Sequence, residues 1–426
     1  MIKIKVFIQK RRYTKGLASV ILSSLFLLNT CLASTIQVSA RKEQSCKALR
    51  SMTRVYMACG DYKKARCLAE QALNLAEKTN ASGPEHCACL LDLAYVYKNQ
   101  GLLADAEMAC QKGLKLQREV YYQNHPYVAY TLRILSEIYK EQARYRDATS
   151  ILEQAMTIMH ENGCENDHVI APFKVDMARL LIVQQNLEKA ESCFKEAMAS
   201  INQSYEPDHL YTTKVLVSIA ELYIEQGRYA EAKELIKKSL AIQEKVYGKD
   251  HHNLVPVFLA MSKVHQAEGD YASANILLNK CLNLIEEQVG PKHPLIGDIL
   301  SSLGQLYTIN EEYRKAEEDL RRALEILEDT VGSENDRTAI AIHNLAKLYM
   351  HQGKYTQAQS FCRKALNTFE TVFSQAHPKV ADVLETMAQL YHKTGNIAEA
   401  ERLAERVEKI RAHKQVALEP SVRGLE

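Results

Sequence analysis

Three possible soft-metal ligands stand close together in the segment EHCACL at residues 85–90, namely His86, Cys87 and Cys89. Cys67 or Cys110 could supply a fourth ligand to a zinc ion. However, Cys87 and Cys89 lie two residues apart in a predicted helix and therefore face different sides of it. The sequence also contains no Cys-x-x-Cys pair, the spacing that zinc sites normally use. We therefore expect no metal or other cofactor, and a metal-binding or redox protein that uses its N-terminal cysteines is kept as a minor hypothesis.

Histidines recur between the predicted helices, at His86, His125, His168, His209, His251, His293 and His377. Successive positions lie about two helix layers apart, at roughly 8–10 Å for each layer. Zinc ligands must all lie about 2.0–2.3 Å from one ion, so these histidines cannot share a metal. Their recurrence instead indicates loop packing and capping of helix N-termini. No phosphate loop, His-Glu-x-x-His or Gly-x-Ser-x-Gly motif occurs either, and we do not expect an enzyme.

The segment LYMHQGKY at residues 348–355 returns along the chain with a fixed spacing. Related segments begin at 55, 96, 138, 180, 222, 264, 306 and 390, so consecutive starts are 41 residues apart once and 42 apart seven times. A spacing held over most of a chain is typical of a repeat architecture. The chain is then one elongated body rather than two or three separate domains.

Each repeat has the periodicity of two helices. In the copy that starts at residue 339, the first helix face follows the i, i+3, i+4, i+7 pattern at Ile342, Leu345, Ala346 and Tyr349. Gly353 is placed to end that helix, because glycine readily adopts the left-handed conformation of a C-terminal cap. A second face follows at Tyr355, Ala358, Phe361, Cys362, Ala365 and Phe369. Each unit is therefore expected to be a helical hairpin that buries its apolar side against its neighbours.

Small residues mark where helices must approach closely. One position is alanine in all nine units, at Ala65, Ala106, Ala148, Ala190, Ala232, Ala274, Ala316, Ala358 and Ala400. A later position is small in most units, at Ala72, Gly113, Ala155, Ala197, Ser239, Cys281, Ala323 and Ala365. We expect both positions to be buried at helix contacts. Most cysteines, like Cys281, are expected to be small core residues.

The order Leu-(Gly/Ala)-x-x-Tyr, then Gly-x-Tyr-x-x-Ala, then a second small residue resembles the tetratricopeptide repeat. The 42-residue length and the segment HNLAKLYMHQGKYTQA at 343–358 are similar to the kinesin light chain subclass. The resemblance implies an all-α fold, a right-handed superhelical solenoid of nine tetratricopeptide-type helical hairpins over residues 41–411. The approximate units are 45–86, 87–128, 129–170, 171–212, 213–254, 255–296, 297–338, 339–380 and 381–411, with a C-terminal tail at 412–426. Two units have Gln185 and Glu311 in place of the glycine.

In this family the first helix of each hairpin lines a concave groove that holds a peptide or a partner protein. The groove positions that the resemblance implies here include Arg50, Arg54, Tyr95, Lys98, Arg133, Lys140, Arg179, Asn344 and Lys347. Basic residues dominate these positions in the first four units, which favours a partner with an acidic segment or a free carboxylate. The alternative is that these cations pair with acids on neighbouring helices. Reversing Arg133 and Arg179 to Glu is expected to weaken partner binding with stability nearly unchanged.

The first forty residues have the order of a secretory signal peptide. A basic region reaches Lys15, an apolar run follows at 17–28, and small residues end at Ala40, where we predict cleavage. An uncleaved N-terminal membrane anchor is the alternative, and no other segment is apolar enough to span a bilayer. Export predicts a periplasmic or secreted protein and permits disulfides among the ten cysteines that remain.

Beyond residue 40 the chain holds 48 basic and 52 acidic residues, since six basic residues lie in the first forty. A slightly acidic body argues against nucleic acid as the main partner. The leading hypothesis is an exported scaffold for protein–protein interaction that holds a peptide or partner protein in its groove. The alternative is a structural or assembly component that acts by self-association.

Overall fold

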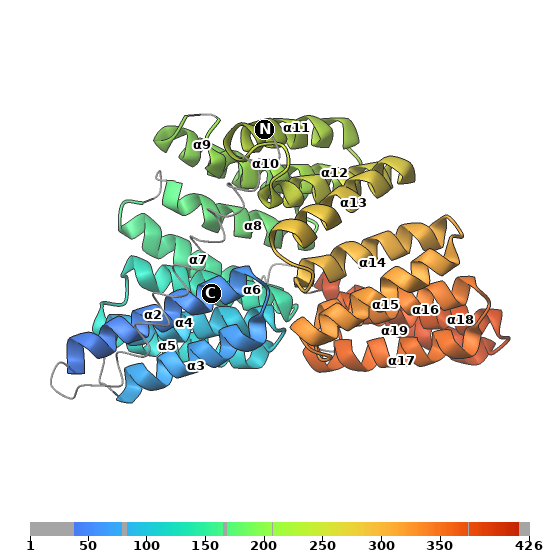
Figure 1. Ribbon diagram of the computed structural model, residues 1–426, viewed down its shortest axis with the longest axis horizontal. Coiled ribbons are helices and arrows are strands. Elements are labelled where there is room, and N and C mark those ends of the chain that lie inside the picture. Colours follow the sequence, from blue (N-terminus) through green and yellow to red (C-terminus); the bar gives the residue numbers. More distant parts are fainter. Residues whose placement is uncertain (1–37, 79–82, 165–167, 207, 374, 417–426) are drawn as a thin grey trace, which may run out of the picture.

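The computed structural model describes residues 38–78, 83–164, 168–206, 208–373 and 375–416. Within these ranges, eighteen α-helices follow one another and pair into nine hairpins (Figure 1). The hairpins are α2 (Val38–Ala58) with α3 (Tyr62–Lys78), α4 (Gly83–Asn99) with α5 (Leu103–Val120), α6 (Pro126–Glu141) with α7 (Tyr145–Glu161), α8 (Ala171–Val183) with α9 (Leu187–Ser204), α10 (Leu210–Glu225) with α11 (Tyr229–Tyr247), α12 (Val255–Ala267) with α13 (Tyr271–Gln288), α14 (Pro294–Ile309) with α15 (Tyr313–Thr330), α16 (Asp336–His351) with α17 (Tyr355–Val372), and α18 (Pro378–Lys393) with α19 (Ile397–Val416). Short 3-10 turns, η1 (His168–Ile170) and η2 (His252–Leu254), precede α8 and α12. The predicted all-α, right-handed superhelical solenoid of nine hairpins is confirmed.

The predicted units and the observed hairpins share one register. Most first helices begin shortly before the predicted start of their unit, as α6 does at Pro126, and α19 runs past residue 411 to Val416. The predicted cleavage point after Ala40 falls in the first turn of α2, and residues 1–37 of the predicted signal peptide lie outside the described residues. Over the described ranges, no helix has both the length and the apolar character of a membrane span.

The alanine that recurs in all nine units lies where the two helices of a hairpin approach each other. It is fully buried in the first eight hairpins and nearly so in the last, at Ala400. Ser239 and Cys281 are fully buried at the second small position, as are the alanines there. Six of the ten cysteines in the described part of the chain are also buried. These positions agree with the predicted register and with the interpretation of most cysteines as small core residues.

Every hairpin turns through one residue in the left-handed backbone conformation. Glycine occupies this position in six hairpins with φ between 72° and 82°, at Gly60, Gly101, Gly227, Gly269, Gly353 and Gly395. Ala143, Gln185 and Glu311 adopt φ values of 58–62° at the same position. The three hairpins without glycine therefore keep the turn, although a non-glycine residue in this conformation costs roughly 1–2 kcal/mol.

The recurring histidines mostly cap helices. The Nδ1 atoms of His125, His209, His251, His293 and His377 each accept a hydrogen bond from the backbone N–H two residues later. Asn335 caps α16 in the same way with its side-chain oxygen. The capping prediction is confirmed at these five histidines, whereas His86 lies inside α4 and His168 begins η1.

First helices form the inner side of the curved solenoid. Those of consecutive repeats pack directly on one another, except between α12 and α14, whereas no two second helices pack closely within the described residues. Elements on the inside of a curve are nearer to each other than those on the outside. We call the surface formed by α2, α4, α6, α8, α10, α12, α14, α16 and α18 the inner wall.

The solenoid curves until its N-terminal turns meet loops near its C-terminal end, where Figure 1 shows blue and cyan helices beside orange ones. Met57 and Tyr62, which flank the first turn, pack against Leu327, Val331 and Ala341. The second turn, at Gly101, lies against Asn335, and the third, at Ala143, lines a cleft with Ala376 and Pro378. We call these contacts between the first three turns and residues 288–294, 330–336, 372–373 and 375–378 the closure seam.

Candidate functional site

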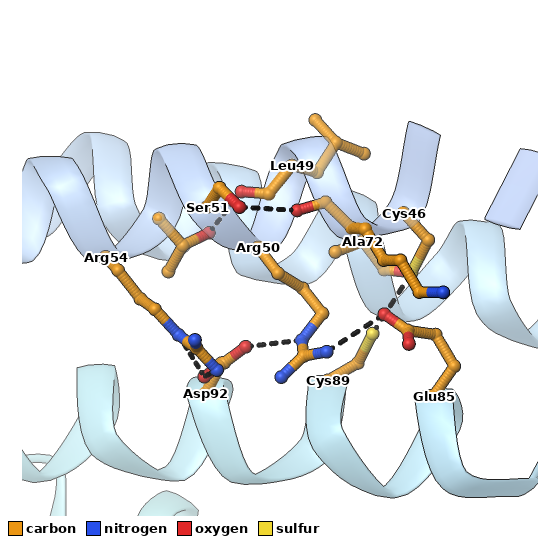
Figure 2. Close-up of polar contacts among 11 residues, drawn as sticks. Cys46, Leu49, Arg50, Ser51, Arg54, Ala72, Glu85, Cys89 and Asp92 are labelled. Carbon is orange, nitrogen blue, oxygen red and sulfur yellow. Dashed lines mark hydrogen bonds and ion pairs between the residues drawn. The ribbon is translucent and has the colours of Figure 1, made fainter. Parts of the chain in front are cut away.

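Charged side chains link α2 to α4 at the N-terminal end of the inner wall (Figure 2). Arg50 donates to Glu85 at 2.9 Å and to Asp92 at 2.6 Å, and Arg54 reaches the other oxygen of Asp92 at 3.2 Å. Burial disfavours the charge of Arg50, but Asp92 and Glu85 outweigh burial and raise its pKa. Arg50 is thus a fixed part of the helix contact.

A second network of charged side chains joins the first helices α4, α6 and α8. Arg133 on α6 donates to Asp176 at 2.6 Å and to Glu137 at 3.2 Å, and Lys98 on α4 pairs with the same Glu137. Burial works against the charge of Glu137, but Lys98 and Arg133 outweigh it and lower the pKa of that carboxyl. At Asp176 burial prevails over Arg133 and raises the pKa. Arg133 and Lys98 therefore neutralise acids of this chain.

Two of the predicted arginines remain accessible on the inner wall. The side chain of Arg54 is 64% exposed and that of Arg179 is 46% exposed. Arg179 donates to the Ser218 hydroxyl at 3.0 Å, and its distance to Asp176 is 3.9 Å. Both guanidinium groups therefore meet water as well as the protein.

The other predicted groove residues have varied surroundings. Lys140 lies 3.2 Å from Glu141, and burial raises the pKa of the half-buried Tyr95, whose ring lies 5.4 Å from the Lys98 ammonium. Asn344 is buried and accepts a hydrogen bond from Gln305 at 2.7 Å, while Lys347 is half-buried on the same helix. The predicted positions thus form a series along the inner wall rather than one compact site.

Five partners in the contacts between first helices occupy one repeat position, at which only Asn344 was predicted from the sequence. It is the residue before the equivalent of Leu345, and it carries Asp92, Asp176, Ser218, Asn344 and Thr386. Each one is hydrogen-bonded to a side chain of the preceding first helix, namely Arg50, Arg133, Arg179, Gln305 and His343. The recurrence of short polar residues at this position was the available signal. The side chains at this position join consecutive repeats.

The structure does not bring the ligands considered in EHCACL together. Within the described residues, the one group of three possible metal ligands is Cys46, Glu85 and Cys89, whose ligand atoms lie within 4.8 Å of one another. Cys67 is exposed, and Cys110 is buried on α5. His86 and Cys87 therefore do not share a candidate site with Cys89.

A curved ladder of helical hairpins with a polar inner wall is typical of repeat proteins that bind other proteins. The profile described as Tetratricopeptide repeat matches residues 170–245, 211–287, 259–329 and 337–412. The profile described as MalT-like TPR region matches residues 38–207. The chain belongs to the tetratricopeptide repeat family, and its repeats form a protein–protein interaction scaffold.

Several solved structures are similar to this chain, and one of them, with a TM-score above 0.5, shares the fold. A Rap protein complexed with Competence and Sporulation Factor is 12% identical, with a TM-score of 0.56 over 88% of this chain and 99% of that one. A putative kinesin light chain from Podosopora anserina, with nearly identical TPR-like repeats, is 24% identical over 49% of this chain and 98% of that one, with a TM-score of 0.40. BtubC (BKLC) from P. vanneervenii is 19% identical over 59% of this chain and 93% of that one, with a TM-score of 0.42. No curated protein matches the sequence.

Proposed function

We propose that the inner wall binds an extended peptide, or an extended segment of a partner protein, that carries acidic groups. This proposal rests on one observation. Arg54 and Arg179 are exposed, and the carboxylate that lies nearest to each of them already forms an ion pair with a different arginine. Arg50 holds Asp92 at 2.6 Å, and Arg133 holds Asp176 at 2.6 Å. Each exposed guanidinium therefore keeps donors for an incoming carboxylate, which its planar fork can grip with two hydrogen bonds.

The positions of the two arginines suggest the length of the ligand. Arg54 lies on α2 and Arg179 on α8, three repeats apart, and the first helices between them pack directly on one another. Three steps of about 8–10 Å span roughly 24–30 Å. An extended chain advances about 3.3–3.6 Å for each residue, so acidic groups about eight residues apart would reach both arginines. The Rap protein, which shares the fold, is complexed with Competence and Sporulation Factor.

A selection from random peptides tests this proposal without knowledge of the natural partner. The full chain serves as bait for a displayed library, and the affinity of selected peptides is measured by fluorescence anisotropy at rising salt. We expect enrichment of Asp and Glu, and weaker binding as salt screens the contacts. Selected peptides that are neutral or basic, or whose affinity ignores salt, would refute an acidic ligand.

We further propose that the scaffold acts after export, in the periplasm or outside the cell. The support is the order of basic, apolar and small residues over positions 1–40. Mass measurement of the N-terminus from the native host tests it. Cleavage after Ala40 is the expected result, and a soluble cytoplasmic chain that still starts at Met1 would oppose it.

Self-association is the second candidate function, and the closure seam is the observation that favours it. The turns of the first hairpins already fit the loops of later ones within one chain, so two copies could use the same complementary edges. Sedimentation velocity over a wide concentration range separates the candidates. A monomer at all concentrations supports the binding scaffold, and a concentration-dependent dimer supports assembly.

A further inference from the structure

Two buried thiols from different repeats lie side by side near the N-terminal end of the inner wall (Figure 2). The sulfur of Cys46 on α2 lies 3.3 Å from the sulfur of Cys89 on α4, although the residues are 43 positions apart. They are 1% and 0% exposed. A small approach of two such sulfurs brings them within bonding reach, because both side chains already point at each other.

Hydrogen bonds distinguish the two sulfurs. The Cys46 thiol donates to the carbonyl oxygen of Ala72 at 3.5 Å, which leaves the Cys89 thiol to donate to the Cys46 sulfur. That hydrogen bond lowers the pKa of Cys46, and the charge of Arg50 acts in the same direction against burial and the nearby carboxylates. The same contact and burial raise the pKa of Cys89. Cys46 is therefore the better nucleophile of the pair.

We propose that Cys46 and Cys89 are a site of reversible oxidation, at which a disulfide joins α2 to α4. A low-molecular-weight disulfide of the glutathione class is the oxidant. The Cys46 thiolate attacks one of its sulfurs, so that a mixed disulfide forms and the first thiolate leaves. Cys89 then gives up its proton and attacks the Cys46 sulfur, and the second thiolate leaves as the intrachain bond forms. The two cysteine protons end on the two released thiols, so one disulfide is reduced as the other is made.

The position of the pair gives oxidation a structural consequence. Among the described residues, the first hairpin stacks on a neighbouring repeat on one side only, and the closure seam contacts it at its turn; α2 packs mainly on α3 and α4. Terminal elements of a solenoid open more readily than internal ones, which gives an oxidant access to the buried pair. Because Arg50 and Arg54 lie on the same helix as Cys46, the disulfide would hold these arginines in place against Asp92.

A metal site is the competing use of these residues, and the surroundings oppose it. Glu85 would be the third ligand, but its carboxylate is held by Arg50 at 2.9 Å, which places a cation beside the site. Structural zinc normally takes four protein ligands. Among the described residues, no fourth ligand joins this group. The two thiols are thus better arranged for a bond to each other.

Mass spectrometry of the full chain tests the proposal directly. The Cys87→Ala variant is used beside the parent, because trypsin leaves Cys87 and Cys89 together in the peptide 79–98, while Cys46 falls in 43–47. After equilibration with oxidised glutathione, free thiols are alkylated in denaturant. We expect a linked pair of these two peptides that is lost on reduction, and a rise in the thermal midpoint on oxidation. In Cys89→Ser we expect a glutathione adduct on Cys46 and no such rise.

Three outcomes would overturn the proposal. The first is full alkylation of Cys46 and Cys89 at the most oxidising ratio, and the second is a link from either residue to a different cysteine. The third is protection of the folded chain from alkylation only after Zn²⁺ is added, reversed by a chelator, which would make the pair a metal site. In samples kept reduced, the exposed Cys59 and Cys67 serve as internal controls for complete alkylation.

Discussion

At the residue scale, the role of a cation on the inner wall depends on how many carboxylates face it and how much water reaches it. Arg133 meets two carboxylates, and its side chain is 18% exposed. Arg179 meets one at 3.9 Å and is far more exposed. Arg133 is therefore part of the folded framework, and we revise the expectation that its reversal leaves stability nearly unchanged.

Charge reversal at Arg133 should damage the fold. Arg133→Glu places a third carboxylate beside Glu137 and Asp176, and loss of one partner from a buried ion pair typically costs about 3–5 kcal/mol. Arg179→Glu is the matched control and should change the free energy of unfolding by less than about 1 kcal/mol, because exposed pairs contribute little. Urea unfolding followed by circular dichroism measures both. Equal losses would contradict the assigned roles.

Two capping histidines at the closure seam should make stability depend on pH. Burial and the charge of Arg337 lower the pKa of His293 to about 4. Burial and the charge of Lys379 lower the pKa of His377 to about 4 as well. The unfolded value is about 6.5, so between pH 6.5 and 4 the unfolded chain binds protons that the folded chain does not. Stability contributed by these caps is therefore complete above pH 6.5 and falls as the pH drops through that window.

Asparagine at these two caps provides the test, since Asn335 caps α16 without titrating. The double variant His293→Asn/His377→Asn should lose less thermal stability between pH 7 and pH 5 than the parent. Burial raises the pKa of Asp298 to about 6, whereas the charge of Arg337 acts to lower it. The contribution of Asp298 to the pH dependence of stability is the same in both proteins. An unchanged difference between the two pH values would mean that the caps do not couple to protonation.

At the element scale, the recurring alanine sets the distance between the helices of a hairpin. Ala232 is fully buried between α10 and α11, whereas Ala230 is exposed two residues earlier. Ala232→Leu should therefore lower stability by about 1–3 kcal/mol, since extra methylenes force the helices apart. Ala230→Leu should have little effect. Thermal midpoints measure the pair, and equal midpoints would show that the repeat register is misplaced.

The helical hairpins could be predicted because their signals are local and repeated. Glycine or a tolerated substitute stands at each left-handed turn, alanine at the close contact within each hairpin, and histidine at five of the caps between hairpins. The roles of the inner-wall cations could not be read in the same way. Whether Arg133 is free depends on Asp176, which lies 43 residues later and meets it only when consecutive repeats stack. The sequence therefore predicted which helices line the wall, and the pairing required the structure.

At the scale of the whole molecule, the closure seam is the feature that repeat spacing could not predict. Its contacts join Gly60 to the loop of His293, and Gly101 to Asn335. These separations are about five and a half repeats, because a turn within one hairpin meets a loop between two later hairpins, and the curvature of the entire stack decides which loop that is. Small changes in packing accumulate over several repeats, so the local pattern does not determine where the ends meet.

A matched pair of glycine substitutions should separate the seam from the turn. Gly60 and Gly353 have φ values of 73° and 72°, so alanine has the same backbone cost at both. A Cβ at Gly60 would lie 2.2 Å from Pro294 Cδ, whereas one at Gly353 would meet nothing within 4 Å. Gly60→Ala should therefore open the seam and raise the radius of gyration in small-angle X-ray scattering. An equal radius of gyration for both variants would argue against a closed seam in solution.

The central claim is that Arg54 and Arg179 receive an acidic partner on the inner wall. Its most direct measurement is the affinity of one selected acidic peptide for Arg54→Glu/Arg179→Glu and for a control with the same change in charge, Arg314→Glu/Arg363→Glu. Both control residues lie on second helices and are exposed, Arg314 to 93% of its side chain. We predict at least about a tenfold loss of affinity for the inner-wall variant, since one charge-assisted hydrogen bond contributes about 1.5–3 kcal/mol. The control should bind like the parent, and equal affinities for the two double variants would contradict the claim.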